Sequence, residues 1–238
     1  MSERPMLLLL PGLLCDERLW EDQLTDLADV ADIAIADLTQ DDSIAAMAAR
    51  AIGLMQARGA DRFAVCGLSM GGYAAIEVWR QAGARVTHLA LLDTSARADT
   101  EAQVRRRRGL MALTRSGQFK GVTPRLLPSL IHPSRLGTPL AQAVRDMAER
   151  VGRDAFLRQQ QAILTRTDSR AELPRVAVPT LVGVGEHDVL TPPELAEEMA
   201  ALIPGSRLVR FADAGHLPTM EVPDAVNVAL RAWLARRV

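Results

Sequence analysis

The 238-residue chain alternates short apolar runs with segments in which apolar residues recur at helical spacing. Continuous apolar runs are typical of strands buried on both faces of a parallel sheet, and a repeat of three or four residues is typical of amphipathic helices. The predicted strands are 6–10, 30–36, 63–66, 86–92, 180–184 and 208–211. The predicted helices are 18–27, 43–58, 70–81, 193–202 and 224–234. This alternation predicts an α/β fold with a mostly parallel sheet of about six strands and helices on both faces.

The alternation stops between residues 96 and 175. This stretch has a helical pattern, is rich in arginine and is interrupted by several glycines and prolines. We therefore predict that residues 96–175 form a helical lid inserted after the fourth strand, and that residues 1–95 and 176–238 together form one core. With 48% apolar residues the chain can bury a sizeable core without disulfides.

A serine lies between a predicted strand and a predicted helix, in the sequence GLSMG at residues 67–71. Glycine is needed two residues before and after this serine, because a strand that turns abruptly into a helix leaves no room there for side chains. Such a turn exposes the serine hydroxyl, and the start of the helix offers backbone N–H groups to a developing oxyanion. We predict that Ser69 is a nucleophile.

A serine hydroxyl needs a base to remove its proton. The chain has four histidines, which are His88, His132, His187 and His216. Only His216 follows the last predicted strand, where its loop opens on the same edge of the sheet as Ser69. We therefore predict that His216 is the base.

The base in turn needs a carboxylate that orients it, on a loop at the same edge and between serine and histidine in chain order. Asp188 meets both conditions, because it follows the strand 180–184. Asp93, at the end of the preceding strand, is the alternative. We favour Asp188 and expect Asp93 to bond backbone donors where Thr94 and Ser95 leave the strand.

Three segments resemble the signature loops of the α/β-hydrolase superfamily, namely residues 67–72, 185–188 and 215–216, and the resemblance spans nearly the whole chain. The first segment is also similar to the elbow of bacterial enol-lactone hydrolases and small carboxylesterases. The resemblance implies an oxyanion hole made by the backbone N–H groups of Leu13 and Met70. Where relatives usually have His-Gly before this first donor, the chain has Pro-Gly, which leaves the donor available.

The resemblance and the three residues together predict hydrolysis of an ester or lactone through an acyl-enzyme intermediate. The lid mixes apolar residues with many arginines, which favours a small or medium carboxylic ester as the small-molecule substrate. The four arginines at 105–108 are expected to form a solvated helix face. This scheme requires no metal or organic cofactor. The same residues could instead cleave a thioester or a carbon–carbon bond, and the fold can also serve as a ligand receptor.

Charge and cysteine content change this picture little. A formal net charge of -1 gives no bias toward nucleic acid or a membrane surface. Cys15 and Cys66 are too few for a disulfide framework, and Cys15 is expected to line the pocket. The apolar run 6–10 is shorter than a signal-peptide core or a membrane span, so we expect a soluble, cytoplasmic protein. Glu221, after the predicted base, is expected to anchor the last helix; the sequence gives no prediction of oligomeric state.

Overall fold

The structure is a computed structural model that describes residues 4–237. Within those residues, six strands form one sheet in the order β2-β1-β3-β4-β5-β6, and every neighbouring pair is parallel. The strands are β1 (Met6–Leu10), β2 (Asp32–Ile35), β3 (Phe63–Leu68), β4 (Val86–Leu92), β5 (Thr180–Gly185) and β6 (Arg207–Phe211). The predicted parallel sheet of about six strands is confirmed.

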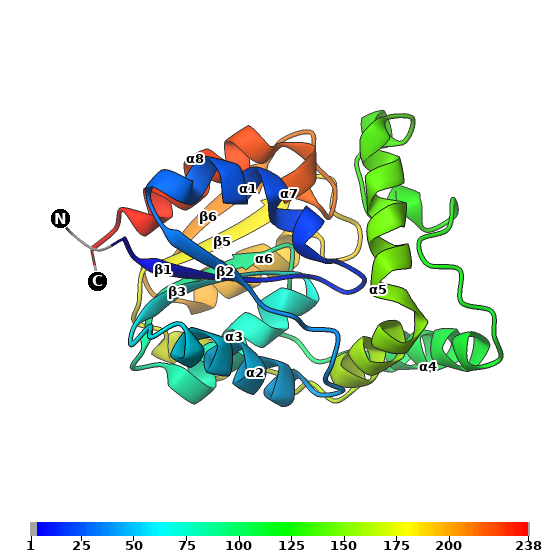
Figure 1. Cartoon of the computed structure of the whole chain (residues 1–238), viewed down its shortest axis with the longest axis horizontal. Coiled ribbons are helices and arrows are strands. Elements are labelled where there is room, and N and C mark those ends of the chain that lie inside the picture. The colour runs from blue at the N-terminus through cyan, green and yellow to red at the C-terminus, as the bar shows by residue number, and fades with distance from the viewer. Residues whose placement is uncertain (1–3, 238) are drawn as a thin grey trace.

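Helices cover both faces of this sheet (Figure 1). One face packs against α8 (Pro223–Leu234) and against the apolar residues on either side of α1 (Glu21–Asp26), which itself lies against α8. The other packs against α2 (Ile44–Ala57), α3 (Met70–Ala82) and α6 (Pro193–Leu202). A strand between two such layers must be apolar on both sides, which explains the continuous apolar runs in the sequence.

Strand β1 shows how both cores depend on one strand. Leu7 and Leu9 belong to the core under α1 and α8, whereas Leu8 and Leu10 belong to the core over α2 and α3. All four side chains are fully buried. Burial of each one stabilises the fold by about 2 kcal/mol, so a polar residue at any of these positions would disrupt one of the cores.

Two long helices lie between β4 and β5 in the chain, α4 (Glu101–Arg115) and α5 (Pro139–Leu164). Figure 1 shows both at one end of the sheet. Helix α5 changes direction at Gly152, whose φ of 78° and ψ of 179° are not helical. The boundaries 96 and 175 of the lid stay a prediction.

Some local structure differs from the sequence-based expectation. The predicted helix 18–27 is a 3-10 turn (Glu17–Trp20), the short helix α1 and a second 3-10 turn (Leu27–Asp29). The first turn starts early because the Asp16 side chain accepts a hydrogen bond from the Arg18 N–H. The short helix α7 (Pro218–Glu221) was not predicted.

The four arginines of α4 do not all face solvent. Arg105, Arg106 and Arg108 are exposed, as expected. Arg107 instead turns inward, where it pairs with the buried Asp99 at 2.7 Å. The run is therefore a solvated face with one inward-facing arginine.

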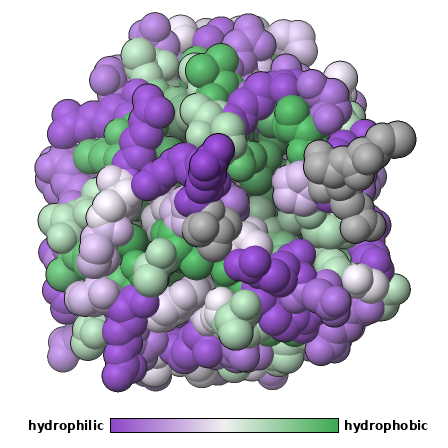
Figure 2. Space-filling model, turned by 90° about the vertical axis from the view of Figure 1, so that its left-hand side faces the viewer, coloured by the Kyte–Doolittle hydropathy of each residue, from purple (hydrophilic) through white to green (hydrophobic). Residues whose placement is uncertain are grey.

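The strands begin on the side of the molecule where Figure 1 marks the two chain ends. Figure 2 shows this side, on which hydrophobic and hydrophilic residues are interleaved. The carboxyl ends of the strands point away from this side, and so do the loops that carry Ser69 and His216. Among residues 4–237, no helix is long and apolar enough to cross a membrane.

Candidate active site

Ser69 occupies the single position between β3 and α3. Its φ of 56° lies in the left-handed region that non-glycine residues rarely adopt, so the turn is strained. Two hydrogen bonds hold it: the Ser69 N–H donates to the Leu92 carbonyl at 2.9 Å, and the Thr94 hydroxyl donates to the Ser69 carbonyl at 2.7 Å. This strand–turn–helix geometry is that of a nucleophile elbow.

The glycines around Ser69 are needed for space. A Cβ on Gly67 would lie 2.0 Å from the Gly71 carbonyl oxygen. A Cβ on Gly71 would lie 1.9 Å from the Leu10 carbonyl oxygen at the end of β1. The start of α3 therefore touches the backbone of the neighbouring strand, which only glycine permits.

The elbow lies where the order of strands in the sheet reverses. Strand β1 has β2 on one side and β3 on the other, so the connections after β1 and β3 leave the sheet in opposite directions. In open α/β sheets the crevice beyond the carboxyl ends of such strands is the usual ligand site. Ser69 and the loop after β1, residues 11–15, meet at this point.

Ser69, His216 and Asp188 form a continuous hydrogen-bonded chain. The His216 Nε2 lies 2.9 Å from the Ser69 Oγ, and the His216 Nδ1 lies 2.8 Å from the Asp188 Oδ2. Asp188 and His216 are buried, whereas Ser69 is partly exposed. The fold thus brings together three residues that are up to 147 positions apart in the sequence.

Asp188 is held firmly as an ionised carboxylate. Its Oδ1 accepts hydrogen bonds from the N–H groups of Leu190 and Thr191, and its Oδ2 accepts one from the Thr191 hydroxyl at 2.6 Å. Burial acts to raise the pKa of Asp188, but the interactions with His216 and Thr191 outweigh it and lower the pKa to about 2. The carboxylate can therefore orient His216 and stabilise its protonated form.

Asp93 is a second buried carboxyl group beside this chain. Its Oδ1 accepts a hydrogen bond from the Gly185 N–H at 2.8 Å. Asp93 thus bonds a backbone donor, as expected, but this donor lies at the end of β5 and not where Thr94 and Ser95 leave β4. Burial and the neighbouring charge of Asp188 raise the pKa of Asp93 well above its ordinary value.

Ligand atoms of Asp93, Asp188 and His216 all lie within 4.8 Å of one another, a grouping that could hold a metal ion. The Nδ1 of His216 and the Oδ2 of Asp188 already share a hydrogen bond. The group is thus a hydrogen-bonded imidazole–carboxylate pair with a neighbouring carboxyl group.

The loop after β1 carries the first predicted oxyanion donor. The Cys15 N–H donates to the Gly12 carbonyl at 3.1 Å, which closes a turn around Leu13 and Leu14. A Cβ built on Gly12 would lie 3.5 Å from the Ser69 Cβ, so this turn is packed against the elbow. No acceptor contacts the Leu13 N–H within residues 4–237.

The second predicted donor, Met70, is the first residue of α3, where N–H groups have no intrahelical acceptor. Both N–H groups are thus available, and their oxyanion role stays a prediction.

Cys15 borders the elbow but is poorly suited to nucleophilic chemistry. A Cβ on Gly12 would lie 3.5 Å from both its Sγ and the Ser69 Cβ. Burial raises the pKa of the Cys15 thiol to about 12, which keeps it protonated at neutral pH.

Glu221 ties the loop of His216 to the segment between β4 and β5. Its buried carboxylate accepts hydrogen bonds from the N–H groups of His132, Gly215 and Leu217, at 2.6, 2.9 and 3.2 Å. The His216 N–H donates to the carbonyl of Leu130, in the same segment, at 3.0 Å. Glu221 therefore fixes the histidine loop, and the expectation that it anchors the last helix is wrong.

Sequence reasoning missed the supporting roles of Thr191 and Glu221. Thr191 could have been found, because an aspartate followed at the third position by threonine is a common local hydrogen-bonded turn. The partners of Glu221 include His132, which is 89 residues away, so only the folded chain reveals them.

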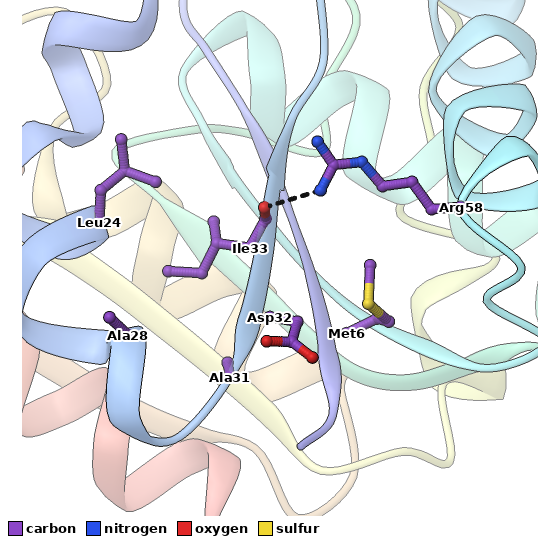
Figure 3. Close-up of a pocket in the computed structure, with 7 residues that line it drawn as sticks. All are labelled: Met6, Leu24, Ala28, Ala31, Asp32, Ile33 and Arg58. Atoms are coloured by element: carbon purple, nitrogen blue, oxygen red, sulfur yellow. Dashed lines mark hydrogen bonds between the residues drawn. The ribbon is translucent and has the colours of Figure 1, made fainter. Parts of the chain in front are cut away.

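Two cavities lie away from this site. One, of about 520 Å³, is at the outer edge of the sheet beside β2, where Arg58 donates to the Ile33 carbonyl (Figure 3). The other, of about 330 Å³, lies between α2, α3 and the segments after β4 and α5. Neither is lined by Ser69, Asp188 or His216.

The family model described as the alpha/beta hydrolase family matches residues 7–229. The chain belongs to the α/β-hydrolase family. Among curated relatives, the pimeloyl-[acyl-carrier protein] methyl ester esterase of Nitrosomonas europaea is 33% identical over 178 residues, which are 68% of each chain. Polyketide synthase ThaQ of Burkholderia thailandensis is 38% identical over 102 residues, which are 40% of this chain and 5% of that protein.

Two solved structures are similar to the chain over nearly its full length. One is a thermophilic esterase from Thermogutta terrifontis, solved with malate bound, with a TM-score of 0.88 and 32% sequence identity. The alignment covers 97% of this chain and 89% of the esterase chain. The enol-lactonase from Burkholderia xenovorans LB400 has a TM-score of 0.89 at 24% identity and covers 99% and 93%. At 24% identity, the similarity to the enol-lactonase shows a shared fold.

Proposed function

We propose that this α/β-hydrolase is a serine hydrolase that cleaves an ester or lactone of a small or medium carboxylic acid. The observation that carries the proposal is the hydrogen-bonded chain from Ser69 Oγ through His216 to Asp188, with distances of 2.9 and 2.8 Å. A strained serine between a strand and a helix, paired with a base and an orienting acid, is what nucleophilic acyl transfer requires.

The reaction follows from the roles of these atoms. The His216 Nε2 takes the hydroxyl proton of Ser69 as the Oγ attacks the substrate carbonyl carbon. The N–H groups of Leu13 and Met70 stabilise the oxyanion that forms. The protonated His216 then gives its proton to the departing alkoxide, and a water molecule repeats the cycle on the acyl-enzyme. Throughout, Asp188 keeps the Nδ1 of the imidazole protonated and stabilises its positive charge.

The relatives support an ester or lactone as the substrate class. The Nitrosomonas europaea relative is named as a methyl ester esterase, and the Thermogutta terrifontis structure is titled as an esterase. We propose that residues 96–175 act as the lid that sets the size of the acid, because Leu130 and His132 contact the loop of His216.

A fluorophosphonate probe tests this proposal, because it labels only an activated serine. We expect the purified wild-type protein to be labelled and Ser69→Ala to lose labelling and about 1,000-fold or more of its activity on p-nitrophenyl esters. Ser95→Ala, which changes a buried serine beyond the end of β4, is the matched control and should keep both.

A series of ester chain lengths, with matched lactones and thioesters, then defines the preferred acyl donor. Absence of labelling in folded wild-type protein would overturn the proposal and favour a ligand receptor.

A further inference from the structure

We propose that Gln159, on helix α5, is a positioning residue that holds the oxyanion loop in its working conformation. The inference rests on the proposed function, since it concerns the turn that directly follows the proposed donor N–H of Leu13. It is carried by a hydrogen bond between two segments that are 145 residues apart: the Leu14 N–H donates to the Gln159 Oε1 at 3.0 Å.

The turn that this bond holds is unfavourable by itself. Leu14 has a φ of 59°, whereas Leu13 is not among the residues with positive φ. Together with the hydrogen bond from the Cys15 N–H to the Gly12 carbonyl, this is the pattern of a type II turn, whose third residue is usually glycine or asparagine. A branched leucine at that position is strained.

Type I and type II turns differ mainly in the orientation of the central peptide, here the one that joins Leu13 to Leu14. The Leu14 N–H belongs to this peptide, so the bond to Gln159 selects the type II orientation. Without that bond, rotation of the peptide to type I would relieve the strain at Leu14. The cost of the strain and the gain from one buried hydrogen bond are of similar size, so the bond shifts the balance toward the type II form. The longer contact of the Cys15 Sγ with the Leu13 carbonyl, at 3.5 Å, acts on the same peptide.

Gln159 is well held for this purpose. Its side chain is fully buried, and its Nε2 donates to the Leu38 carbonyl, in the loop after β2, at 3.2 Å. An amide that accepts with one atom and donates with the other has one orientation in this place. Gln159 therefore links α5, the loop after β1 and the loop after β2, and it transmits the position of α5 to the turn beside Ser69.

Replacement by methionine, of similar length and without hydrogen-bonding groups, tests the inference. We expect Gln159→Met to lower kcat on the best p-nitrophenyl ester by about 10- to 100-fold, less than the loss of a whole oxyanion donor. KM and the pH profile of kcat should change little, because the turn affects the transition state and leaves Ser69, His216 and Asp188 in place.

Two further variants separate positioning from general packing. Gln160→Met changes the next buried glutamine, which accepts from the Arg107 Nη1 at 2.9 Å and lies outside the oxyanion loop, and should keep kcat within about twofold. Gln159→Glu keeps an acceptor for the Leu14 N–H, and its protonated form keeps a donor for the Leu38 carbonyl, so it should recover part of the lost kcat at low pH. Hydrogen exchange of the Leu14 amide should be faster in Gln159→Met only.

The outcomes distinguish this inference from the proposed function. A wild-type protein that neither reacts with fluorophosphonate nor hydrolyses esters overturns both. If the wild type is labelled, the proposed function stands and the positioning role is tested alone. That role is overturned if Gln159→Met keeps its kcat, changes only its KM, or has a kcat no lower than that of Gln160→Met. It is also overturned if the Leu14 amide of Gln159→Met exchanges as slowly as that of the wild type.

Discussion

At the residue scale, the pKa values of two buried aspartates are shifted in opposite directions: that of Asp188 is lowered and that of Asp93 is raised. Asp188 accepts three hydrogen bonds from Leu190 and Thr191 and faces His216, so its charged form is favoured. Asp93 has one backbone donor, and burial and the charge of Asp188 disfavour its ionisation. Two carboxyl groups this close cannot both carry a charge at low cost. The charge is therefore more favourable on Asp188 than on Asp93.

Asparagine substitutions test this assignment, because asparagine has the shape and neutrality of a protonated aspartate. Asp93→Asn should keep kcat within about threefold, whereas Asp188→Asn should lose about four orders of magnitude because the tautomer of His216 is no longer enforced. Steady-state kinetics on one ester measures both, with circular dichroism to show that each variant folds. A loss in Asp93→Asn as large as that in Asp188→Asn would show that Asp93 is the acid.

At the scale of elements, close contacts of backbone with backbone fix where the helices lie. Helix α3 starts so near β1 that Gly71 has no room for a side chain. Gly53, in the interior of α2, is the opposite case, because a Cβ there would meet nothing within 4 Å. The two glycines are thus present for different reasons.

Alanine substitutions at these glycines should change stability in opposite directions. Gly71→Ala should lower the free energy of unfolding by about 3 kcal/mol or more, because the start of α3 must move away from β1. Gly53→Ala should raise it by about 0.5–1 kcal/mol, because alanine is the better helix former. Urea unfolding measures both changes; a stable Gly71→Ala variant with full activity would contradict the packing argument.

For the whole molecule, the free energy of unfolding at low pH depends partly on Asp188. Its pKa falls from 3.8 to about 2 in the folded state, so ionisation stabilises the fold above pH 3.8 and this contribution is lost as the pH falls through 2. It amounts to about 2 kcal/mol. Asp93 acts in the opposite sense, because a raised pKa favours the fold at low pH and this contribution is lost as the pH rises.

The contribution of Asp188 can be isolated by comparison with Asp188→Asn. The difference in unfolding free energy between the wild type and the variant should shrink as the pH is lowered from about 5 to about 2. Urea titrations at steps across this range measure it. A difference that stays constant with pH would mean that the ionised carboxylate of Asp188 does not stabilise the fold.

The sequence by itself determined the parallel sheet, the position of Ser69 between a strand and a helix and the histidine that approaches it, and it favoured Asp188 over Asp93. These features follow from local pattern and chain order: apolar runs specify buried strands, and parallel strands bring their following loops to one edge. The division of helix 18–27 and the bend at Gly152 were not visible in that pattern.

Only the tertiary structure decided the contacts that support this site. Gln159 meets Leu14 across 145 residues, and Glu221 meets His132 across 89. Such side chains form no periodic pattern, because their partners are single backbone groups brought near by the packing of α5 and the neighbouring loops. The raised pKa of Asp93 likewise depends on burial and on the neighbouring Asp188, both of which exist only once the chain is folded.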